Sequence, residues 1–228
     1  MSGRNIVITG GFGALGRVVA AAFAAAGDKV ARIDFAPSAP DTIPGGMDLP
    51  GVDLTDDAAV DKAVAAVTAQ LGGIDVLVNI AGGFTWETLE GGSLAAWERM
   101  FSMNLRSNAT ITRAALPALR QSKAGRIVNI GAGAALQAAA GMGAYAASKA
   151  GVHRLTEALA AELADTAITV NALLPSIIDT PTNRADMPDS DFSQWVQPGA
   201  IADAILFLAS PGARSISGAL IPVTRGAG

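Results

Sequence analysis

The chain has 228 residues, of which 50% are hydrophobic and 16% are charged, and its formal net charge is −4. This composition excludes disorder over most of the length, and no basic run or uninterrupted apolar segment indicates nucleic acid or a membrane as a partner. The lack of cysteine excludes disulfides, a thiolate nucleophile and cysteine-based metal sites, and the single histidine excludes a His-rich cluster, so we expect no metal.

The first elements in the chain predict a βαβ unit. Arg4–Thr9 is a β-branched run that predicts a strand, and it begins too early to leave room for a signal peptide. Ala14–Ala26 is rich in alanine and predicts a helix ended by Gly27, while Lys29–Ile33 predicts a second strand that ends at Asp34. We therefore expect strand, Gly-rich turn, helix and strand in a cytoplasmic protein.

The rest of the chain continues this alternation after a loop with five Pro or Gly residues over positions 37–46. Helices are predicted over Asp56–Gln70, Leu94 to about Gln121 (with Pro117 as a break or bend), Gly143–Leu163 and Ala200–Leu208, and strands over Ile74–Ile80, Arg126–Ile130, Ile168–Leu174 and Ala219–Val223. Residues 179–197 are polar and are predicted to form a substrate flap. The pattern predicts one α/β domain over residues 1–228, a Rossmann-type doubly wound parallel sheet with helices on both faces.

The turn after the first strand has the spacing of a dinucleotide-binding loop. Gly11, Gly13 and Gly16 fit G-x-G-x-x-G between a strand and a helix. Glycines allow a pyrophosphate to approach the backbone, and the helix start offers free N–H groups to the phosphates. The turn is predicted to bind the cofactor through Gly10, Gly11, Phe12, Gly13, Ala14, Leu15 and Gly16.

The acid at the end of the second strand predicts which dinucleotide is bound. Asp34 follows Gly16 by eighteen residues, and its carboxylate can accept hydrogen bonds from both ribose hydroxyls of NAD. It would repel the 2′-phosphate of NADP, and Arg32 is the nearby basic residue. We therefore predict NAD(H) in preference to NADP(H), with a turn-forming acid as the alternative interpretation of Asp34.

Two further segments are predicted to contact the cofactor. Asp53 and Leu54 could meet the adenine edge, and Asn79, Ala81 and Gly82 follow the strand over 74–80, at an edge where open sheets bind ligands. The alternative for both segments is ordinary turn chemistry.

Tyr145 and Lys149 lie four residues apart in a predicted helix, so both side chains leave one face. A phenol titrates near pH 10, and a neighbouring ammonium favours the phenolate, which would suit the pair to general acid–base catalysis. Taken alone, the spacing more often marks a surface contact. His153, four residues further on, is interpreted as a packing or surface residue.

Together these motifs resemble the short-chain dehydrogenase/reductase family over nearly the whole chain. Residues 9–16, Asp34, Asp53, 79–82, Asn104, Tyr145, Lys149 and 175–180 occur in the family's order and spacing. The resemblance implies that Tyr145 exchanges a proton with substrate, that Lys149 lowers the pKa of Tyr145 and holds the nicotinamide ribose, and that Asn104 holds a water. It further implies that the nicotinamide carboxamide lies by Pro175, Ile178 and Thr180, and that the protein is a homodimer or homotetramer.

The chain departs from the family pattern at the catalytic serine. That serine is expected thirteen residues before the tyrosine, where this chain has Ala132. A methyl group cannot donate a hydrogen bond to a developing alkoxide, and losing one such donor typically costs about 10²–10³ in rate. A smaller departure is Ala14 in the Gly-rich turn, although Gly at 10, 13 and 16 fits a variant pattern.

One branch resembles the chain more closely: dihydropteridine reductase, which reduces quinonoid dihydropterin with NADH and also has alanine at this position. The matching segments are 10–16, 81–83, 141–145, His153, 179–184, Met187-Pro188 and 191–195, whereas Asn104 follows the wider family. A conjugated ring spreads the developing charge, so a second donor is less necessary. The predicted substrate contacts are Phe84, Trp86 and Trp195 as walls for a flat ring, with core or flap packing as the alternative. Asn183 and Arg184 are predicted to meet its polar edge, with hydrogen bonding within the flap as the alternative.

Two other functions remain open. One is a general carbonyl reductase or alcohol dehydrogenase, in which Gln137 or a water replaces the serine. The other is a non-catalytic NAD(H)-binding sensor, which the intact Tyr145, Lys149 and Asn104 disfavour. For all three functions we expect a small-molecule ligand and no nucleic acid or membrane partner.

Overall fold

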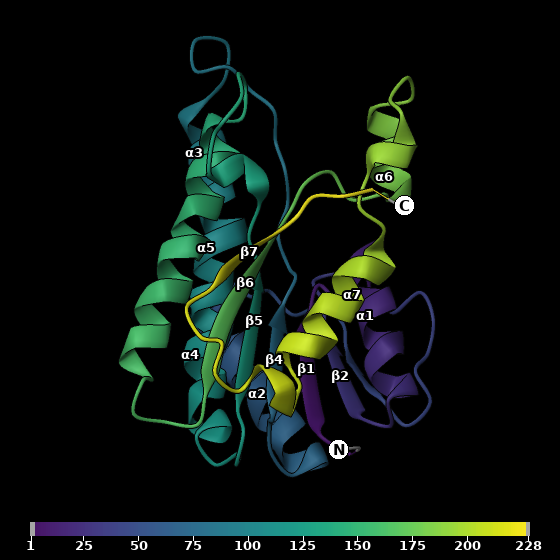
Figure 1. Cartoon of the computed structure of the whole chain (residues 1–228), viewed down its shortest axis with the longest axis vertical. Helices are drawn as coiled ribbons and strands as arrows, with labels where there is room; N and C mark the ends of the chain where they lie inside the picture. The colour runs from purple at the N-terminus through teal and green to yellow at the C-terminus, as the bar shows by residue number, and fades with distance from the viewer. Residues whose placement is uncertain (1–2, 227–228) are drawn as a thin grey trace.

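The computed structural model describes residues 3–226, and within them seven parallel strands form one sheet (Figure 1). The strand order is β3-β2-β1-β4-β5-β6-β7, so successive strands are added on one side of β1 up to β3 and on its other side from β4 onward. The strands are β1 (Asn5–Thr9), β2 (Lys29–Ile33), β3 (Met47–Leu49), β4 (Val76–Asn79), β5 (Arg126–Ile130), β6 (Thr169–Pro175) and β7 (Leu220–Val223). The predicted fold class is confirmed, and the reversal of strand order at β1 creates the crevice where such sheets bind ligands.

Helices cover both faces of the sheet (Figure 1). They are α1 (Ala14–Ala25), α2 (Asp57–Leu71), α3 (Leu94–Met100), α4 (Ser107–Leu119), α5 (Gly143–Glu162), α6 (Pro181–Asp186) and α7 (Pro198–Leu208), with a π-helix, η1 (Phe101–Arg106), between α3 and α4. Strand β1 shows the two layers, because Ile6 and Ile8 pack toward α1 and α7 while Val7 packs toward α2 and α4. Successive side chains of a strand point to opposite faces, so a strand buried on both faces is apolar throughout.

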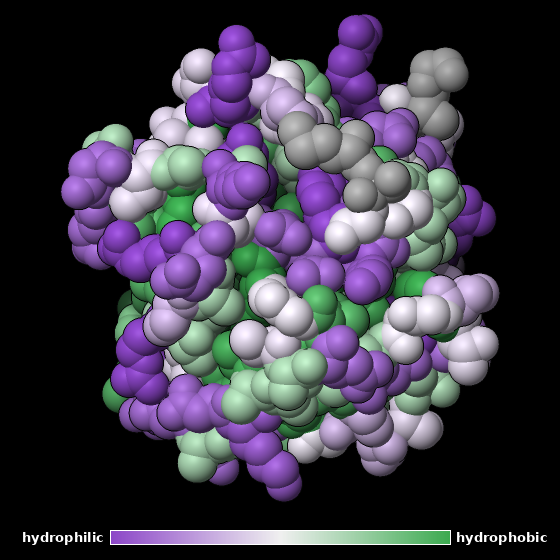
Figure 2. Space-filling view, turned by 90° about the horizontal axis from the view of Figure 1, so that it is seen from below, coloured by the Kyte–Doolittle hydropathy of each residue, from purple (hydrophilic) through white to green (hydrophobic). Residues whose placement is uncertain are grey.

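The surface seen from below is mixed. Hydrophilic side chains dominate the rim and divide the hydrophobic surface on this side into small areas (Figure 2). None of the helices within residues 3–226 is both long and apolar enough to cross a membrane.

Three details differ from the sequence prediction. Strand β3 was not predicted; it is short and pairs only with β2. The long helix expected from Leu94 to about Gln121 is divided into α3, η1 and α4. Pro117 does not break α4, which ends two residues later at Leu119, and the Arg120 N–H still donates to the Leu116 carbonyl.

The predicted flap is partly helical and folds back onto the sheet. It contains α6 and a 3₁₀ turn over Phe192–Gln194, and Ile178 forms an isolated bridge with Val196. Helix α7 begins at Pro198, two residues earlier than predicted, because the fixed φ of proline suits the first position of a helix.

Candidate active site

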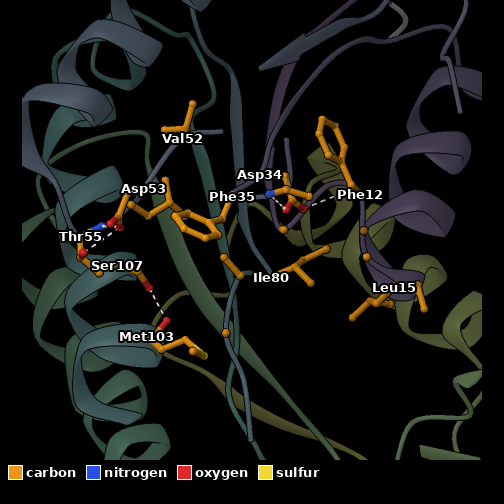
Figure 3. A pocket seen from close by; sticks show the side chains of 18 of the residues that line it. Phe12, Leu15, Asp34, Phe35, Val52, Asp53, Thr55, Ile80, Met103 and Ser107 are labelled. Carbon is orange, nitrogen blue, oxygen red and sulfur yellow. Dashed lines mark hydrogen bonds between the residues drawn. The ribbon is translucent and has the colours of Figure 1, made fainter. Parts of the chain in front are cut away.

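A cavity of about 780 Å³ lies where the ends of β1, β2 and β4 meet (Figure 3). It brings together most residues that the sequence predicted to bind the cofactor, although they come from five segments of the chain. The predicted residues that line it are Gly10, Phe12, Gly13, Ala14, Leu15, Gly16, Asp34, Asp53, Leu54, Ala81, Gly82 and Thr180. Phe35, which the sequence did not single out, also lines it and is largely exposed.

Glycine is required in the turn because the chain folds closely on itself. Gly10 has a φ of +65°, and a Cβ there would lie 2.9 Å from the Ala81 nitrogen. A Cβ on Gly16 would overlap the Gly10 carbonyl oxygen. Helix α1 starts at Ala14 with no acidic residue in its first turn, so its free N–H groups suit an anionic ligand.

Asp34 is held at the edge of this cavity by backbone groups. Its Oδ2 accepts a hydrogen bond from the Phe12 N–H at 2.9 Å, and its Oδ1 accepts one from the Ala36 N–H at 3.0 Å. The turn-forming role of Asp34 is therefore present in the structure. It is compatible with ribose binding, because a carboxylate has about four acceptor positions.

A second cavity, of about 480 Å³, adjoins the first and shares Leu15, Ile80 and Gly82 with it. Of the residues predicted for chemistry or substrate contact, it is lined by Phe84, Tyr145, Lys149 and Asn183, and of those predicted to lie by the nicotinamide carboxamide, by Pro175 and Ile178. Its remaining lining is mainly apolar and includes Ala132, Met142 and Met187. Two adjoining, mainly apolar cavities with a few polar groups are typical of small-molecule sites, so both are candidates for ligand binding.

Burial governs the ionisation of Tyr145 and Lys149. The Lys149 side chain is buried and its Nζ donates a hydrogen bond to the Ile130 carbonyl at 2.8 Å, and burial lowers the pKa of Lys149 to about 8. Burial raises the pKa of Tyr145 to about 12. The lowering of the Tyr145 pKa by Lys149 is therefore not found in the protein by itself, because removal of the phenol from water raises this pKa.

The ring of Tyr145 is also fixed from outside the helix. The rings of Phe84 and Tyr145 meet edge to face, with centroids 5.0 Å apart and planes at 79°. Phe84 is about half exposed, so it forms an outer wall beside the half-buried Tyr145 rather than part of the core. The predicted contact of Phe84 with substrate stays a prediction, and its place in the second cavity is compatible with it.

Asn104 lies in the π-helix η1 and is fully buried. Its Oδ1 accepts from the Gly83 N–H at 2.9 Å, and its Nδ2 donates to the Gly83 carbonyl at 3.1 Å and to the Ser148 Oγ at 2.9 Å. Ser148 in turn donates to the Tyr145 carbonyl at 2.7 Å. A Cβ on Gly82 would lie 2.5 Å from the Asn104 Oδ1 and 3.4 Å from the Lys149 Nζ, so Gly82 keeps space open between these groups.

Ala132 lies buried in the wall of the second cavity. Its N–H donates to the Nε2 of His153 at 3.3 Å, and a Cβ on Gly131 would lie 2.5 Å from that nitrogen. Burial, with help from Arg154 and Lys149, lowers the pKa of His153, which suits a neutral imidazole that accepts at Nε2. His153 is therefore a buried residue that fixes the Ala132 turn, a role that its spacing from Lys149 did not reveal.

Several predicted residues lie away from both cavities within the described part of the chain. The Asn79 Nδ2 donates to the side chains of Asn108, Thr112 and Asn129 in a buried network beneath the cavities. Gly11 packs against Arg32, where a Cβ would lie 2.5 Å from the Arg32 Cβ. These two contacts are structural, because alternate residues of a strand or turn face opposite sides.

Four side chains that the sequence predicted to contact substrate or to replace the serine lie elsewhere in the structure. Trp195 is buried against Phe192, with ring centroids 4.7 Å apart, because the flap folds back onto the sheet. Arg184 makes an ion pair with Asp179 whose shorter contact is 2.6 Å, and this pair, with Gln197, lowers the pKa of Asp179 to about 2. Trp86 and Gln137 are exposed and lie outside the second cavity, so neither provides the wall or donor expected of it.

Known proteins resemble this chain throughout its length. A family profile described as short chain dehydrogenase matches residues 4–191. A short chain dehydrogenase of Pseudocercospora fijiensis is 34% identical over 195 residues, which are 82% of this chain and 63% of that relative. The 3-oxoacyl-(acyl-carrier-protein) reductase MabA of Mycobacterium bovis is 33% identical over 233 residues, covering 99% of this chain and 93% of the relative.

A solved structure of a related reductase is also similar to this chain over almost its whole length. The 3-ketoacyl-(acyl-carrier-protein) reductase from Brucella melitensis complexed with NADH superposes with a TM-score of 0.88 at 27% identity, covering 98% of this chain and 97% of the other. None of these three proteins is a dihydropteridine reductase, so the comparisons support the family and not that branch.

Proposed function

Because the chain belongs to the short chain dehydrogenase family and is an oxidoreductase of that family, we propose that it uses NADH to reduce a flat conjugated substrate of the quinonoid dihydropterin type. One observation carries the substrate proposal. Ala132 lies in the wall of the cavity that also contains Tyr145, so one of the two expected donors to a developing oxyanion is replaced by a methyl group. A ring that spreads its charge tolerates this loss better than a ketone does.

The first cavity fits the cofactor. The close turn around Gly10 and Gly16 and the acid-free start of α1 would hold the pyrophosphate, and Asp34 would accept from the adenosine ribose hydroxyls. Lys149 would bind the nicotinamide ribose. The bound nicotinamide supplies the hydride. Preference for NADH follows from the position of Asp34, whose charge opposes a 2′-phosphate.

Tyr145 supplies the proton that accompanies the hydride. With a pKa of about 12 its hydroxyl keeps its proton at neutral pH, which suits a donor in the reducing direction. As the phenolate forms, the ammonium of Lys149 stabilises it, and a proton from solvent restores the phenol through the groups around Asn104. Hydride and proton together convert the quinonoid ring to its reduced form.

The test is a substrate panel with purified protein. Quinonoid dihydropterins, quinones, simple ketones and a 3-oxoacyl thioester are assayed with NADH and with NADPH. We expect Ala132→Ser to raise kcat/KM for ketones by about 10²–10³ and to change pterin turnover much less. Ala134→Ser, which adds a hydroxyl to the same cavity away from the serine position, is the control. Equal gains for both substrate classes would remove our explanation of Ala132.

A second function has an observation in its favour. MabA and the Brucella enzyme are both named as reductases of 3-oxoacyl or 3-ketoacyl groups. A carbonyl reductase of that kind would need a water in place of the serine, because Gln137 lies outside the cavity. Ketone turnover without pterin turnover would favour it, and tight NADH binding without any turnover would favour a sensor. In each case we propose a homodimer or homotetramer, as the family resemblance implies.

A further inference from the structure

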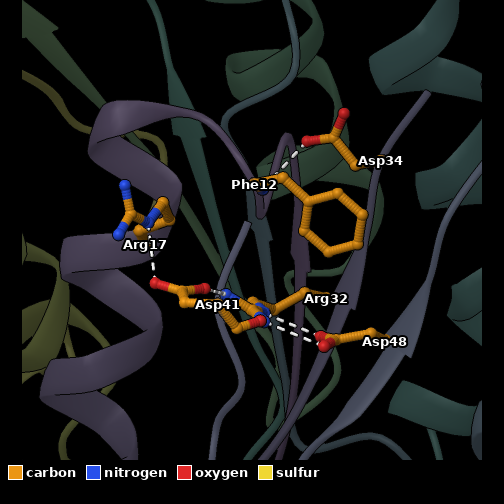
Figure 4. A network of polar contacts seen from close by, with 6 residues as sticks. All are labelled: Phe12, Arg17, Arg32, Asp34, Asp41 and Asp48. Atoms are coloured by element: carbon orange, nitrogen blue, oxygen red, sulfur yellow. Dashed lines mark hydrogen bonds and ion pairs between the residues drawn. The ribbon is translucent and has the colours of Figure 1, made fainter. Parts of the chain in front are cut away.

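Two arginines beside the first cavity are bound by acids from the loop over residues 37–46 and from β3. Arg32 is 1% exposed, and its Nε and Nη2 donate to the two oxygens of Asp48 at 2.7 and 2.9 Å. Its Nη1 donates to the Asp41 Oδ1 at 2.6 Å. The other oxygen of Asp41 accepts from the Arg17 Nε at 2.7 Å, so this one carboxylate joins both arginines (Figure 4).

Phe12 links this network to Asp34. The Phe12 N–H donates to Asp34, and the guanidinium of Arg32 lies 5.2 Å from the centre of the Phe12 ring. Figure 4 shows the Phe12 ring between Asp34 and Arg32. Arg17 follows Gly16, which lines the cavity, yet among the described residues that line it neither Arg17 nor Arg32 is found.

Asp41 and Asp48 differ in what they can control. Asp48 is the register partner of Arg32 in the neighbouring strand, so that ion pair is part of the sheet. Asp41 comes from the loop and is the contact common to Arg17 and Arg32. Its ionised form is secured, because hydrogen bonds from Arg32 and Arg17 lower the pKa of Asp41. Arg17 remains about half exposed, so it has room to reorient once it is released.

We propose that Asp41 determines cofactor specificity by holding Arg17, which withholds from the 2′-phosphate of NADP(H) a cation that would offset the charge of Asp34. A 2′-phosphate beside a carboxylate needs a charge-assisted partner, and arginine is the usual one. Arg32 keeps its bonds to Asp48 and to the Asp41 carbonyl without the Asp41 carboxylate. Asp41 thus acts through Arg17, and Asp34 acts directly. The inference rests on the proposed preference for NADH and extends it to a second residue.

The first experiment compares Asp34→Ser with Asp34→Ser/Asp41→Asn. We expect the ratio of kcat/KM for NADPH over NADH to rise about tenfold more in the double variant, because a released arginine gains a charged hydrogen bond to the phosphate. Asp34→Ser/Asp41→Glu keeps the carboxylate and should behave as Asp34→Ser alone. Asp34→Ser/Asp203→Asn changes the net charge equally at an exposed position of α7 and should also leave the ratio unchanged.

The second experiment measures binding without any substrate. Adenosine 2′,5′-bisphosphate and adenosine 5′-monophosphate are titrated calorimetrically into the same variants. We expect replacement of Asp41 by Asn to strengthen binding of the bisphosphate about tenfold and to leave binding of the monophosphate unchanged. Binding of the bisphosphate should also become more sensitive to salt. A gain no larger than that of the Asp203 control overturns the role of Asp41. A wild-type protein that prefers the bisphosphate overturns the NADH preference instead, and Asp41→Ser replaces Asp41→Asn if the latter fails to fold.

Discussion

At the scale of single residues, the proposed role of Tyr145 is that of a proton donor before that of a base. Tyr145 lines the second cavity, its ring meets that of Phe84 edge to face, and burial raises its pKa to about 12. We therefore expect the group to hold its proton at neutral pH until charge develops on a substrate. Lys149, with a pKa of about 8, is mostly protonated at the same pH and can stabilise the phenolate that results.

Replacing Tyr145 by Phe tests this role with little change of shape. We expect the rate of hydride transfer from NADH to fall by about 10²–10⁴, because the proton donor is lost while the ring and its contact with Phe84 remain. Single-turnover kinetics measures the rate, and a fluorescence titration checks that NADH affinity is almost unchanged. A variant that retains its rate would assign the proton to another group.

At the scale of elements, the π-helix η1 lines the first cavity and its Asn104 binds a residue that lines the second. It places Asn104 so that both polar ends of the side chain bind Gly83 and the amide also reaches Ser148 in α5. An α-helix interrupted by one π turn is a common feature of functional sites, since the extra residue redirects side chains. Met103 of the same turn lines the first cavity, so one short element contributes to that cavity directly and to the second one through the Gly83 contact of Asn104.

The Asn104→Ala variant should have both a lower stability and a lower kcat. We expect the free energy of unfolding to fall by about 1–3 kcal/mol, because the partly buried Gly83 amide and carbonyl lose their partner, and kcat to fall as well. Asn104→Asp is the matched control: it can accept from the Gly83 N–H but cannot donate to Ser148. Chemical denaturation measures the free energy of unfolding, and steady-state kinetics measures kcat. Unchanged kinetics in both variants would mean that Asn104 is a purely structural residue.

At the scale of the whole molecule, the buried Lys149 connects folding to pH. The unfolded chain holds this proton up to about pH 10.5, whereas the folded protein releases it above about pH 8. Between these values the unfolded state binds more protons, so the free energy of unfolding contributed by Lys149 rises with pH. Tyr145 acts oppositely at higher pH: its proton leaves the unfolded chain near pH 10 and the folded protein near pH 12, so its contribution falls over that interval.

The variant Lys149→Met removes the titrating ammonium, so comparison with wild type isolates the pH dependence that Lys149 contributes. The difference in unfolding free energy between wild type and variant should shift in favour of wild type by up to about 3 kcal/mol as pH rises from about 8 to 10.5, and should be constant below 8. Urea denaturation at a series of pH values measures the difference. A difference that is flat across this interval would mean that Lys149 is not desolvated in the folded protein.

Motifs with local causes could be predicted from the amino-acid sequence alone. The Gly-rich turn depends on φ and on close backbone approach, the apolar strands depend on burial from two sides, and Tyr145 and Lys149 depend on helical spacing. For the same reason the parallel, doubly wound architecture and most residues of the first cavity could be predicted. The alanine at position 132 was equally visible, because it departs from a fixed spacing.

Only the tertiary structure decided which way several side chains face and which charges they meet. Trp195 is turned to the core because the flap folds back, and Arg32 is bound to Asp41 and Asp48 because a loop and an unpredicted strand pack beside β2. The pKa of Tyr145 is raised because residues from several elements bury the phenol. Spacing along a chain reports neighbours on one element. Desolvation and ion pairing depend on neighbours from distant elements, which appear only when the chain has folded.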